Sequence, residues 1–221
     1  MMVFIRGSVT YLMQKFLSII FLLIFFICGC GGPVQQNIAT AKIPAQTVSQ
    51  PPSGKEPYGK NLYRNKENHF SIIFPEGWEQ SGGRGPNVVV VSKNKTGESI
   101  NIIVKKLPDQ FKKYTFENFS QQDVNDFVAI NIQDTKKGYP DTSFDGSGTA
   151  YVNNCKAIWI KTTQTYKNPT NSFQLTSIIY FIWKNGKQYT ISCFAPPEKF
   201  AKYENIFISS IGSFVLEEGW Y

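Results

Sequence analysis

The segment that most constrains the fold runs from Phe173 to Trp183. At its centre, an extended strand would carry aliphatic and aromatic side chains on both faces: Leu175, Ile179 and Phe181 on one, and Ile178, Tyr180 and Ile182 on the other. A strand that is apolar on both faces has to be covered on both faces. The sequence therefore predicts a central strand of a sheet with packed structure on either side.

The segments that flank this strand predict an antiparallel meander. Residues 157–166 alternate in polarity, as a strand with one buried face does. Asn185-Gly186 is the strongest short signal for a hairpin, because both central residues of a type I′ turn need positive φ. Residues 187–194 form the returning strand.

The first half of the domain reads as further strands. Phe70, Ile72 and Phe74 share one face of a short run, and Pro75-Glu76-Gly77 ends it. The apolar run 88–91 and the run 100–104 are separated by a turn at 93–97, which indicates an antiparallel hairpin.

Two segments have helical periodicity. Thr115 is the expected N-cap of the first, whose inner face carries Phe116, Phe119, Phe127 and Val128. The second opens at Pro196-Pro197, since proline is tolerated in a first helical turn. Its inner stripe is expected to be Phe200, Tyr203, Phe207 and Ile211, with Phe214 closing the chain against the sheet. The order of elements predicts an α+β domain: a central antiparallel sheet of about six to eight strands with two main helices on its faces.

The N-terminal segment has the pattern of a secretory signal. Lys15 precedes an apolar run at residues 16–27, and small residues follow. This run would span about 18 Å as a helix, whereas a membrane-spanning helix needs about 20 apolar residues. Because Met13 begins a complete signal by itself, it is a candidate for the true start of the chain.

Ile27-Cys28-Gly29-Cys30 resembles the lipobox of bacterial lipoproteins. The resemblance implies cleavage between Gly29 and Cys30, with diacylglycerol on the Cys30 thiol and acylation of the freed amine in many species. Residues 1–29 would then be a lipoprotein signal peptide, and Cys28 would leave with it. The alternative is an uncleaved membrane anchor.

Residues 31–57 lack aromatic side chains and contain five prolines, at 33, 44, 51, 52 and 57. Such a segment buries too little apolar surface to offset the entropy of ordering. We expect residues 30–57 to be a lipidated cysteine followed by a flexible tether, with a root-mean-square reach of about 30 Å. The folded domain is then 58–221. The predicted location is outside the cytoplasm, held to the cell membrane or the outer membrane.

The formal net charge is +7, from 23 basic and 16 acidic residues. Loss of Arg6 and Lys15 with the signal leaves 21 basic residues against 16 acidic ones, or +5. The lysines occur as scattered pairs, at 105–106, 112–113 and 136–137, and no basic run reaches five residues. The pattern predicts a solvated surface and no nucleic-acid partner.

The sequence offers no clear catalytic, cofactor or metal site. His69 is the single histidine, so a Ser-His-Asp or Cys-His site would have to use it, and its polar neighbours favour a solvated position before a strand. Residues 141–147 resemble the start of a calcium loop, but the position of the bidentate glutamate is Val152, so a polar turn is expected. Residues 82–86 are glycine-rich without the lysine of a phosphate loop, and we expect a mobile loop.

Cys155 and Cys193 lie in the domain of an exported chain, where a disulfide is favourable. In the predicted meander, however, Cys155 lies opposite residue 184 and Cys193 opposite residue 178. The two cysteines are then two strands and about 20 Å apart along the sheet, whereas a disulfide needs Cα atoms within about 7 Å. We expect two free, buried thiols.

The segment from Phe70 to Trp78, Phe-Ser-Ile-Ile-Phe-Pro-Glu-Gly-Trp, resembles the opening of PsbP-like domains. Residues 186–192 and the helix ending in Ile211-Gly-Ser-Phe214 resemble their closing strand and helix. The resemblance covers residues 63–216 and implies the α/β/α sandwich of the Mog/PsbP superfamily, which includes DcrB-like lipoproteins and photosystem II extrinsic proteins. Its members are generally non-enzymatic binding or assembly proteins.

The leading functional hypothesis is therefore a membrane-anchored, non-catalytic module of the cell envelope. It would contact membrane lipid through acylated Cys30 and bind an envelope protein. An envelope hydrolase that uses scattered Asp, Tyr or Lys residues is the alternative from another class, and a cleft joining Asp145 to His69 would favour it. A photosystem II-type accessory role is the third.

Overall fold

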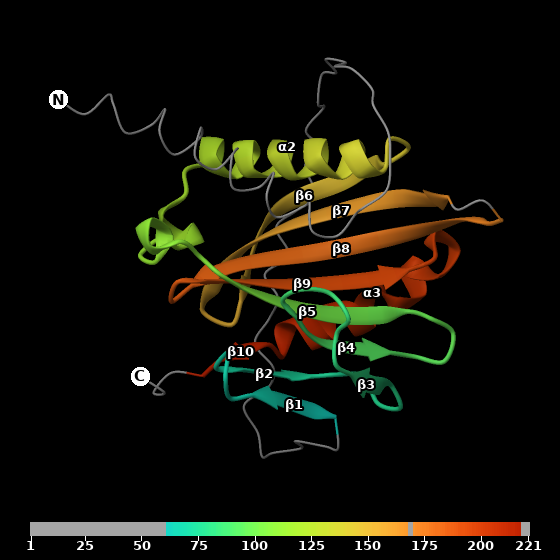
Figure 1. The fold of residues 1–221 in the computed structure, drawn as a ribbon, viewed down its shortest axis with the longest axis horizontal. Coiled ribbons are helices and arrows are strands. Elements are labelled where there is room, and N and C mark those ends of the chain that lie inside the picture. Colours follow the sequence, from blue (N-terminus) through green and yellow to red (C-terminus); the bar gives the residue numbers. More distant parts are fainter. Residues whose placement is uncertain (1–60, 168–169, 218–221) are drawn as a thin grey trace.

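A computed structural model describes residues 61–167 and 170–217 (Figure 1). The predicted signal peptide, Cys30 and the tether lie outside these residues. The strands are β1 (Leu62–Asn65), β2 (Phe70–Ile73), β3 (Glu79–Ser81), β4 (Val88–Lys93), β5 (Ser99–Lys106), β6 (Ser143–Val152), β7 (Cys155–Lys167), β8 (Ser172–Lys184), β9 (Lys187–Ala195) and β10 (Val215–Leu216). The helices are η1 (Asp109–Phe111), η2 (Phe116–Asn118), α2 (Gln121–Gly138) and α3 (Pro197–Gly212).

The fold is α+β, as predicted. Seven strands form one antiparallel sheet in the order β3-β4-β5-β9-β8-β7-β6, and β1-β2-β10 form a second, smaller sheet. The meander β7-β8-β9 is confirmed in its register, since Ala157 lies opposite Ile182 and Ile178 opposite Cys193. Its hairpin turn has positive φ at both Asn185 (53°) and Gly186 (70°), as the type I′ turn requires.

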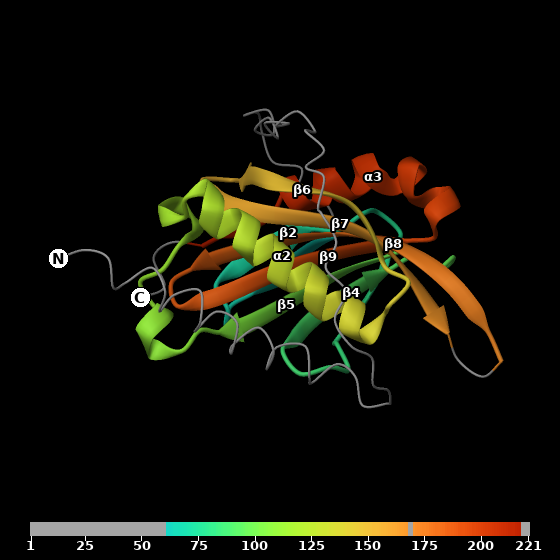
Figure 2. The ribbon, with the colours of Figure 1, turned by 90° about the horizontal axis from the view of Figure 1, so that it is seen from above.

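The two main helices cover opposite faces of the large sheet (Figures 1 and 2). On one face, α3 and the small sheet enclose a core that includes Phe70, Ile182, Ile191 and Phe207. Phe214 is also buried there, and its ring stacks on Phe70 with centroids 5.3 Å apart. The predicted inner stripe of α3 is confirmed, and its apolar contacts hold the helix against this face of the sheet.

On the opposite face, α2 and the two short helices cover β7 and β8. The aromatic rings meet closely: Phe116 stacks on Trp183 at 4.8 Å, and Phe127 meets Phe181 edge-on at 5.2 Å. Ile158 and Ile160 of β7 complete this second core. Strand β8 therefore supplies side chains to both cores, as its sequence predicts.

The first helix begins later than predicted. Thr115 precedes only the three-residue η2 and makes no side-chain cap, while α2 starts at Gln121. Ser120 is the N-cap: its hydroxyl accepts from the Asp123 N–H, and the Asp123 carboxylate accepts from the Ser120 N–H at 2.8 Å. This capping box gives hydrogen-bond partners to two backbone N–H groups at the start of the helix, so α2 begins directly after Ser120.

Four strands were not predicted from the sequence: β1, β3, β6 and β10. The most consequential is β6, because residues 143–147, expected to be a polar turn, begin this ten-residue edge strand. The strand is rich in glycine and small polar residues, since it lies at the edge of the sheet and needs few apolar side chains.

The large sheet has a register shift of the β-bulge kind in its edge strand β6 and another in β4, the strand next to the opposite edge. In β4 the register shifts between Val88 and Val90, and in β6 it shifts between Phe144 and Gly146. Strand β3 pairs with β4 only from Val91 to Lys93, so the bulged part of β4 has no neighbour in β3. Within residues 61–167 and 170–217, no helix has both the length and the hydropathy to cross a membrane.

We expect Phe127→Ala to destabilise the domain by about 3–5 kcal/mol, because it removes the ring that joins α2 to Phe181 and Trp183. Urea unfolding followed by circular dichroism measures the change. The control is Tyr151→Ala, which removes a ring that is 56% exposed on β6 and should change stability by about 0.5 kcal/mol or less. Similar losses in the two variants would contradict this account of the second core.

Candidate functional site

The structure does not bring the predicted catalytic candidates together. His69 precedes β2 in the small sheet, and Asp145 lies on β6, the edge strand of the large sheet. Asp145 is exposed and accepts hydrogen bonds from Ser143 (3.0 Å) and Thr163 (2.7 Å), both within its own sheet. The cleft that would favour a hydrolase, with Asp145 beside His69, is not formed.

The two other segments singled out in the sequence, 141–147 and 82–86, are parts of the strand framework. Asp141 pairs with Lys167 on the neighbouring strand, and Ser143 begins β6, so the resemblance to a calcium loop has no counterpart in the backbone. Among the described residues, no group of three or more His, Cys, Asp or Glu side chains could hold a metal ion. Residues 82–86 connect β3 to β4.

Cys155 and Cys193 are both thiols, as predicted from the meander. Cys193 is fully buried, and burial raises the pKa of its thiol. Cys155 is only half-buried, which corrects the expectation of two buried thiols. It differs because it starts β7 beside the turn to β6, whereas Cys193 lies within β9 and packs in the core shared by α3 and the small sheet.

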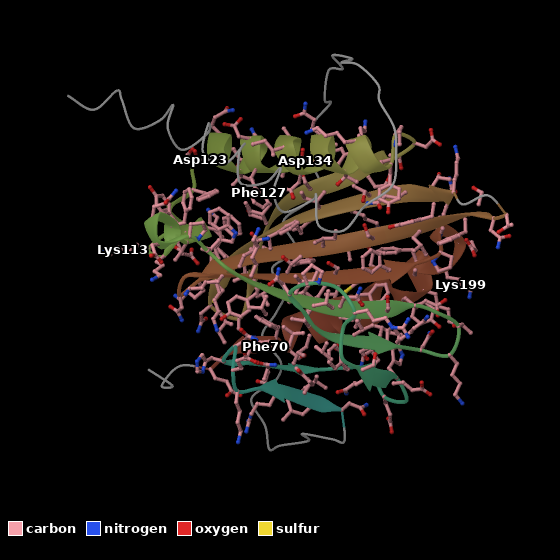
Figure 3. All side chains as sticks on the ribbon, viewed as in Figure 1. Phe70, Lys113, Asp123, Phe127, Asp134 and Lys199 are labelled. Atoms are coloured by element: carbon pink, nitrogen blue, oxygen red, sulfur yellow. The ribbon has the colours of Figure 1, made fainter. Side chains whose placement is uncertain are left out.

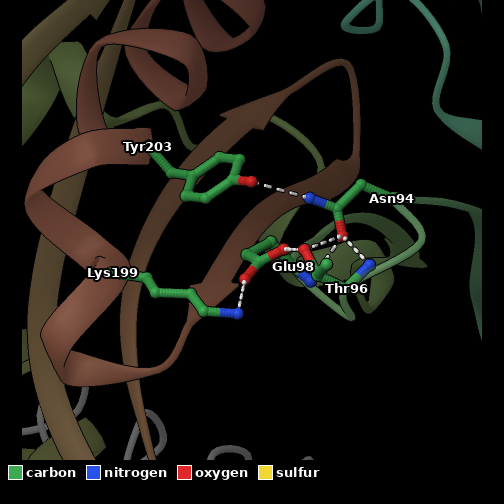
Figure 4. Close-up of polar contacts among 5 residues, drawn as sticks. All are labelled: Asn94, Thr96, Glu98, Lys199 and Tyr203. Atoms are coloured by element: carbon green, nitrogen blue, oxygen red, sulfur yellow. Dashed lines mark hydrogen bonds and ion pairs between the residues drawn. The ribbon is translucent and has the colours of Figure 1, made fainter.

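A buried carboxylate anchors the β4–β5 turn to α3 (Figure 4). Glu98 is 0% exposed and pairs with Lys199 in the first turn of α3, with 3.1 Å between Oε1 and Nζ. The Thr96 hydroxyl donates to Oε2 of Glu98. Asn94 holds the turn, because its Oδ1 accepts from the N–H groups of Thr96 (2.9 Å) and Glu98 (3.1 Å). Its Nδ2 donates to the Tyr203 hydroxyl at 3.1 Å.

These contacts determine the ionisation of Glu98. Burial alone raises the pKa of the carboxyl, but the hydrogen bonds from Thr96, Lys199 and Asn94 together outweigh burial and lower the pKa to about 2. The carboxylate is therefore charged and fully paired at neutral pH. This is the chemistry of a structural clamp, whereas a general acid would need a raised pKa.

A second buried carboxylate lies on α2 (Figure 3). Asp134 is 5% exposed, and its Oδ1 pairs with Lys137 at 2.6 Å. Its Oδ2 has no hydrogen-bond partner among the described residues.

The fold gathers lysines that are scattered in the sequence. Lys106 of β5 lies directly opposite Lys187 of β9, and Lys187 lies directly opposite Lys184 of β8. A Cβ added at Gly186 would lie 3.1 Å from Cγ of Lys112, so η1 approaches the turn between these strands. We call this set the basic end: Lys105, Lys106, Lys112, Lys113, Lys184 and Lys187. The scattered pairs of the sequence are thus brought to one end of the sheet, because register and loop packing unite residues up to about 80 positions apart.

Glu98→Gln should remove a pH-dependent part of the stability. A carboxyl whose pKa is lowered on folding stabilises the folded state above its unfolded pKa, near 4.5, and loses that contribution as the pH falls towards about 2. We expect the variant to be less stable than the parent by on the order of 3 kcal/mol at pH 7, and the difference to shrink between pH about 4.5 and 2. Urea unfolding across this range tests it. Glu198→Gln, an exposed change beside Lys199, is the control. An equal deficit at both ends of the pH range would show that the charge of Glu98 is irrelevant.

Similarity to known proteins fits this architecture. Residues 59–216 match the PsbP family. The solution structure of CyanoP, the PsbP protein of Synechocystis sp. PCC 6803, superposes with a TM-score of 0.51 at 14% identity, over 74% of this chain and 98% of CyanoP. The crystal structure of LpqN, which is involved in cell envelope biogenesis of Mycobacterium tuberculosis, gives 0.45 at 11% identity, over 66% of this chain and 82% of LpqN. A search of curated proteins finds no match to the sequence. Since the matched segment is most of the chain and spans both sheets and both main helices, this protein belongs to the PsbP family.

Proposed function

We propose that this chain is a lipid-anchored protein of the cell envelope whose PsbP-family domain is a non-catalytic binding or assembly module. The observation that carries the proposal is the lipobox-like Ile27-Cys28-Gly29-Cys30, placed at the end of a short apolar run that follows Lys15. A thiol at this position is the acceptor of diacylglycerol, and two or three acyl chains hold a protein at a bilayer far more firmly than one.

The segments after Cys30 support a module that works at a surface. A proline-rich stretch without aromatic residues runs to residue 57, and the family match begins at residue 59. A tether of this length has a reach of about 30 Å, comparable to the size of the domain, so the domain can contact partners above the headgroups. The location outside the cytoplasm follows from the signal peptide.

The arrangement of ionisable groups supports binding over catalysis. His69 lies in the turn before β2 of the small sheet and Asp145 on β6 of the large sheet, and the charged Glu98 is paired with Lys199 and hydrogen-bonded. The lysines of the basic end lie on the surface, where they suit electrostatic contact with a partner. No comparable arrangement of side chains among the described residues supports the hydrolase alternative. The photosystem accessory role has only the shared fold in its support, and fold alone does not assign function.

Cys30→Ala should abolish the anchor. We expect the variant to lose incorporation of radiolabelled palmitate and to keep its signal peptide, because the peptidase of lipoproteins cuts before a lipidated cysteine. Cys28→Ala is the matched control: it alters a cysteine two positions away that is removed with the signal, so labelling and cleavage should stay as in the parent. If Cys30→Ala is still labelled with palmitate and still cleaved, the lipid anchor at this residue is wrong.

A further inference from the structure

The six lysines of the basic end come from three separate parts of the chain and meet at one end of the large sheet. Lys105 and Lys106 end β5, Lys112 and Lys113 follow η1, and Lys184 and Lys187 flank the β8–β9 turn. Lys106, Lys112 and Lys113 are exposed. Figure 3 shows Lys113 at the end of the molecule opposite Lys199.

Positive charge is in excess at this end. Among the described residues, Asp109 pairs with Lys112 at 2.8 Å, and the carboxylate of Glu67 lies close enough to Lys187 to act on it electrostatically. Of the six lysines, Lys112 is the one that forms a salt bridge with a described residue. Lys106, Lys187 and Lys184 occupy one row across three adjacent strands, and like charges directly opposite each other in a sheet repel. An external array of anions would relieve this repulsion.

The kind of basic side chain at this end indicates the kind of anion that it would bind. All six side chains are lysines, which act as flexible point charges, whereas recognition of a single phosphate or carboxylate commonly uses the planar, bidentate guanidinium of arginine. A broad row of lysines suits a diffuse anionic plane. Each lysine near an anionic leaflet contributes about 1 kcal/mol, or about fivefold in affinity.

We infer that the basic end is the surface with which this domain rests on anionic phospholipid headgroups. The inference rests on the proposed function, because the anchor at Cys30 would hold the domain within reach of the bilayer. The end of β5 that carries Lys106 is then nearest the membrane. The opposite end of β5, with Lys93 and Lys95 beside its first residue, points away at a distance of about 25 Å.

Lysine footprinting on the full lipid-modified chain tests the orientation. The protein is reconstituted in vesicles of phosphatidylcholine alone or of phosphatidylcholine mixed with phosphatidylglycerol, and an amine-reactive acetylating reagent reports the modification rate of each lysine by mass spectrometry. We expect Lys106, Lys112 and Lys113 to react at least about fivefold more slowly on the anionic vesicles. Lys93 and Lys95 should react equally on both. Raising the salt from about 0.1 M to about 1 M shortens the screening length from about 10 Å to 3 Å and should restore the rates.

A pair of matched variants identifies the lysines responsible. Lys112→Gln with Lys113→Gln should remove most of the protection at Lys106, while Lys93→Gln with Lys95→Gln, which removes the same charge at the other end, should leave it intact. Circular dichroism confirms that each variant is folded.

Other outcomes would overturn the inference. Equal rates on the two kinds of vesicle, or slowing at both ends alike, would show that the basic end does not face the lipid. Protection of the basic end by added polyglutamate but not by anionic vesicles would instead indicate an acidic protein partner. Flotation with phosphatidylcholine vesicles depends only on the acyl anchor, so its failure would reject the proposed function separately from the orientation.

Discussion

Burial of strand β8 on both faces is the constraint on which the rest of the structure depends. Its alternate side chains enter two different cores, with Tyr180 and Ile182 on the side of α3 and Phe181 and Trp183 on the side of α2. Neither helix can leave without exposing one of these rows to water. The two helices therefore have to lie on opposite faces, and the first and last strands of the domain, β1 and β10, flank β2 in the small sheet on the side of α3.

Charged residues occur in two different environments in this fold, one buried and one exposed. Glu98 is withdrawn from water, and donors from the β4–β5 turn and from α3 replace its lost hydration. At the far end of β5, Lys106, Lys112 and Lys113 are exposed, and of these three Lys112 alone forms a salt bridge among the described residues. Strand β5 therefore has a buried, hydrogen-bonded carboxylate just before its first residue and exposed lysines at its other end. Only these lysines are available to a partner.

Much of the framework was predictable because its signals are local. The Asn185-Gly186 turn, the two-faced pattern of β8 and the proline-opened α3 each depend on neighbouring residues, and the register they imply placed both cysteines correctly. The short strands β1, β3 and β10 and the polar strand β6 were missed because pairing with distant partners decides them. For the same reason the sequence pattern does not predict the basic end. This set requires the pairing of β5 with β9, whose residues are about 80 to 95 positions apart. The helix start was misplaced because Thr115 and Ser120 are both capable caps, and only Ser120 has a suitable acid three residues later.

The bulges in β4 and β6 bear on how copies of the domain would meet if they are held at a membrane as we propose. Molecules confined to a bilayer meet edge to edge far more often than molecules free in solution, and an open sheet invites its neighbours to add strands and polymerise. In β6 an extra residue, the charged Asp145, breaks the regular spacing of the free N–H and C=O groups, and the extra residue of β4 lies in the part of that strand that β3 does not cover. Crowding on a surface can then raise the local concentration of the domain without joining its sheets into a filament.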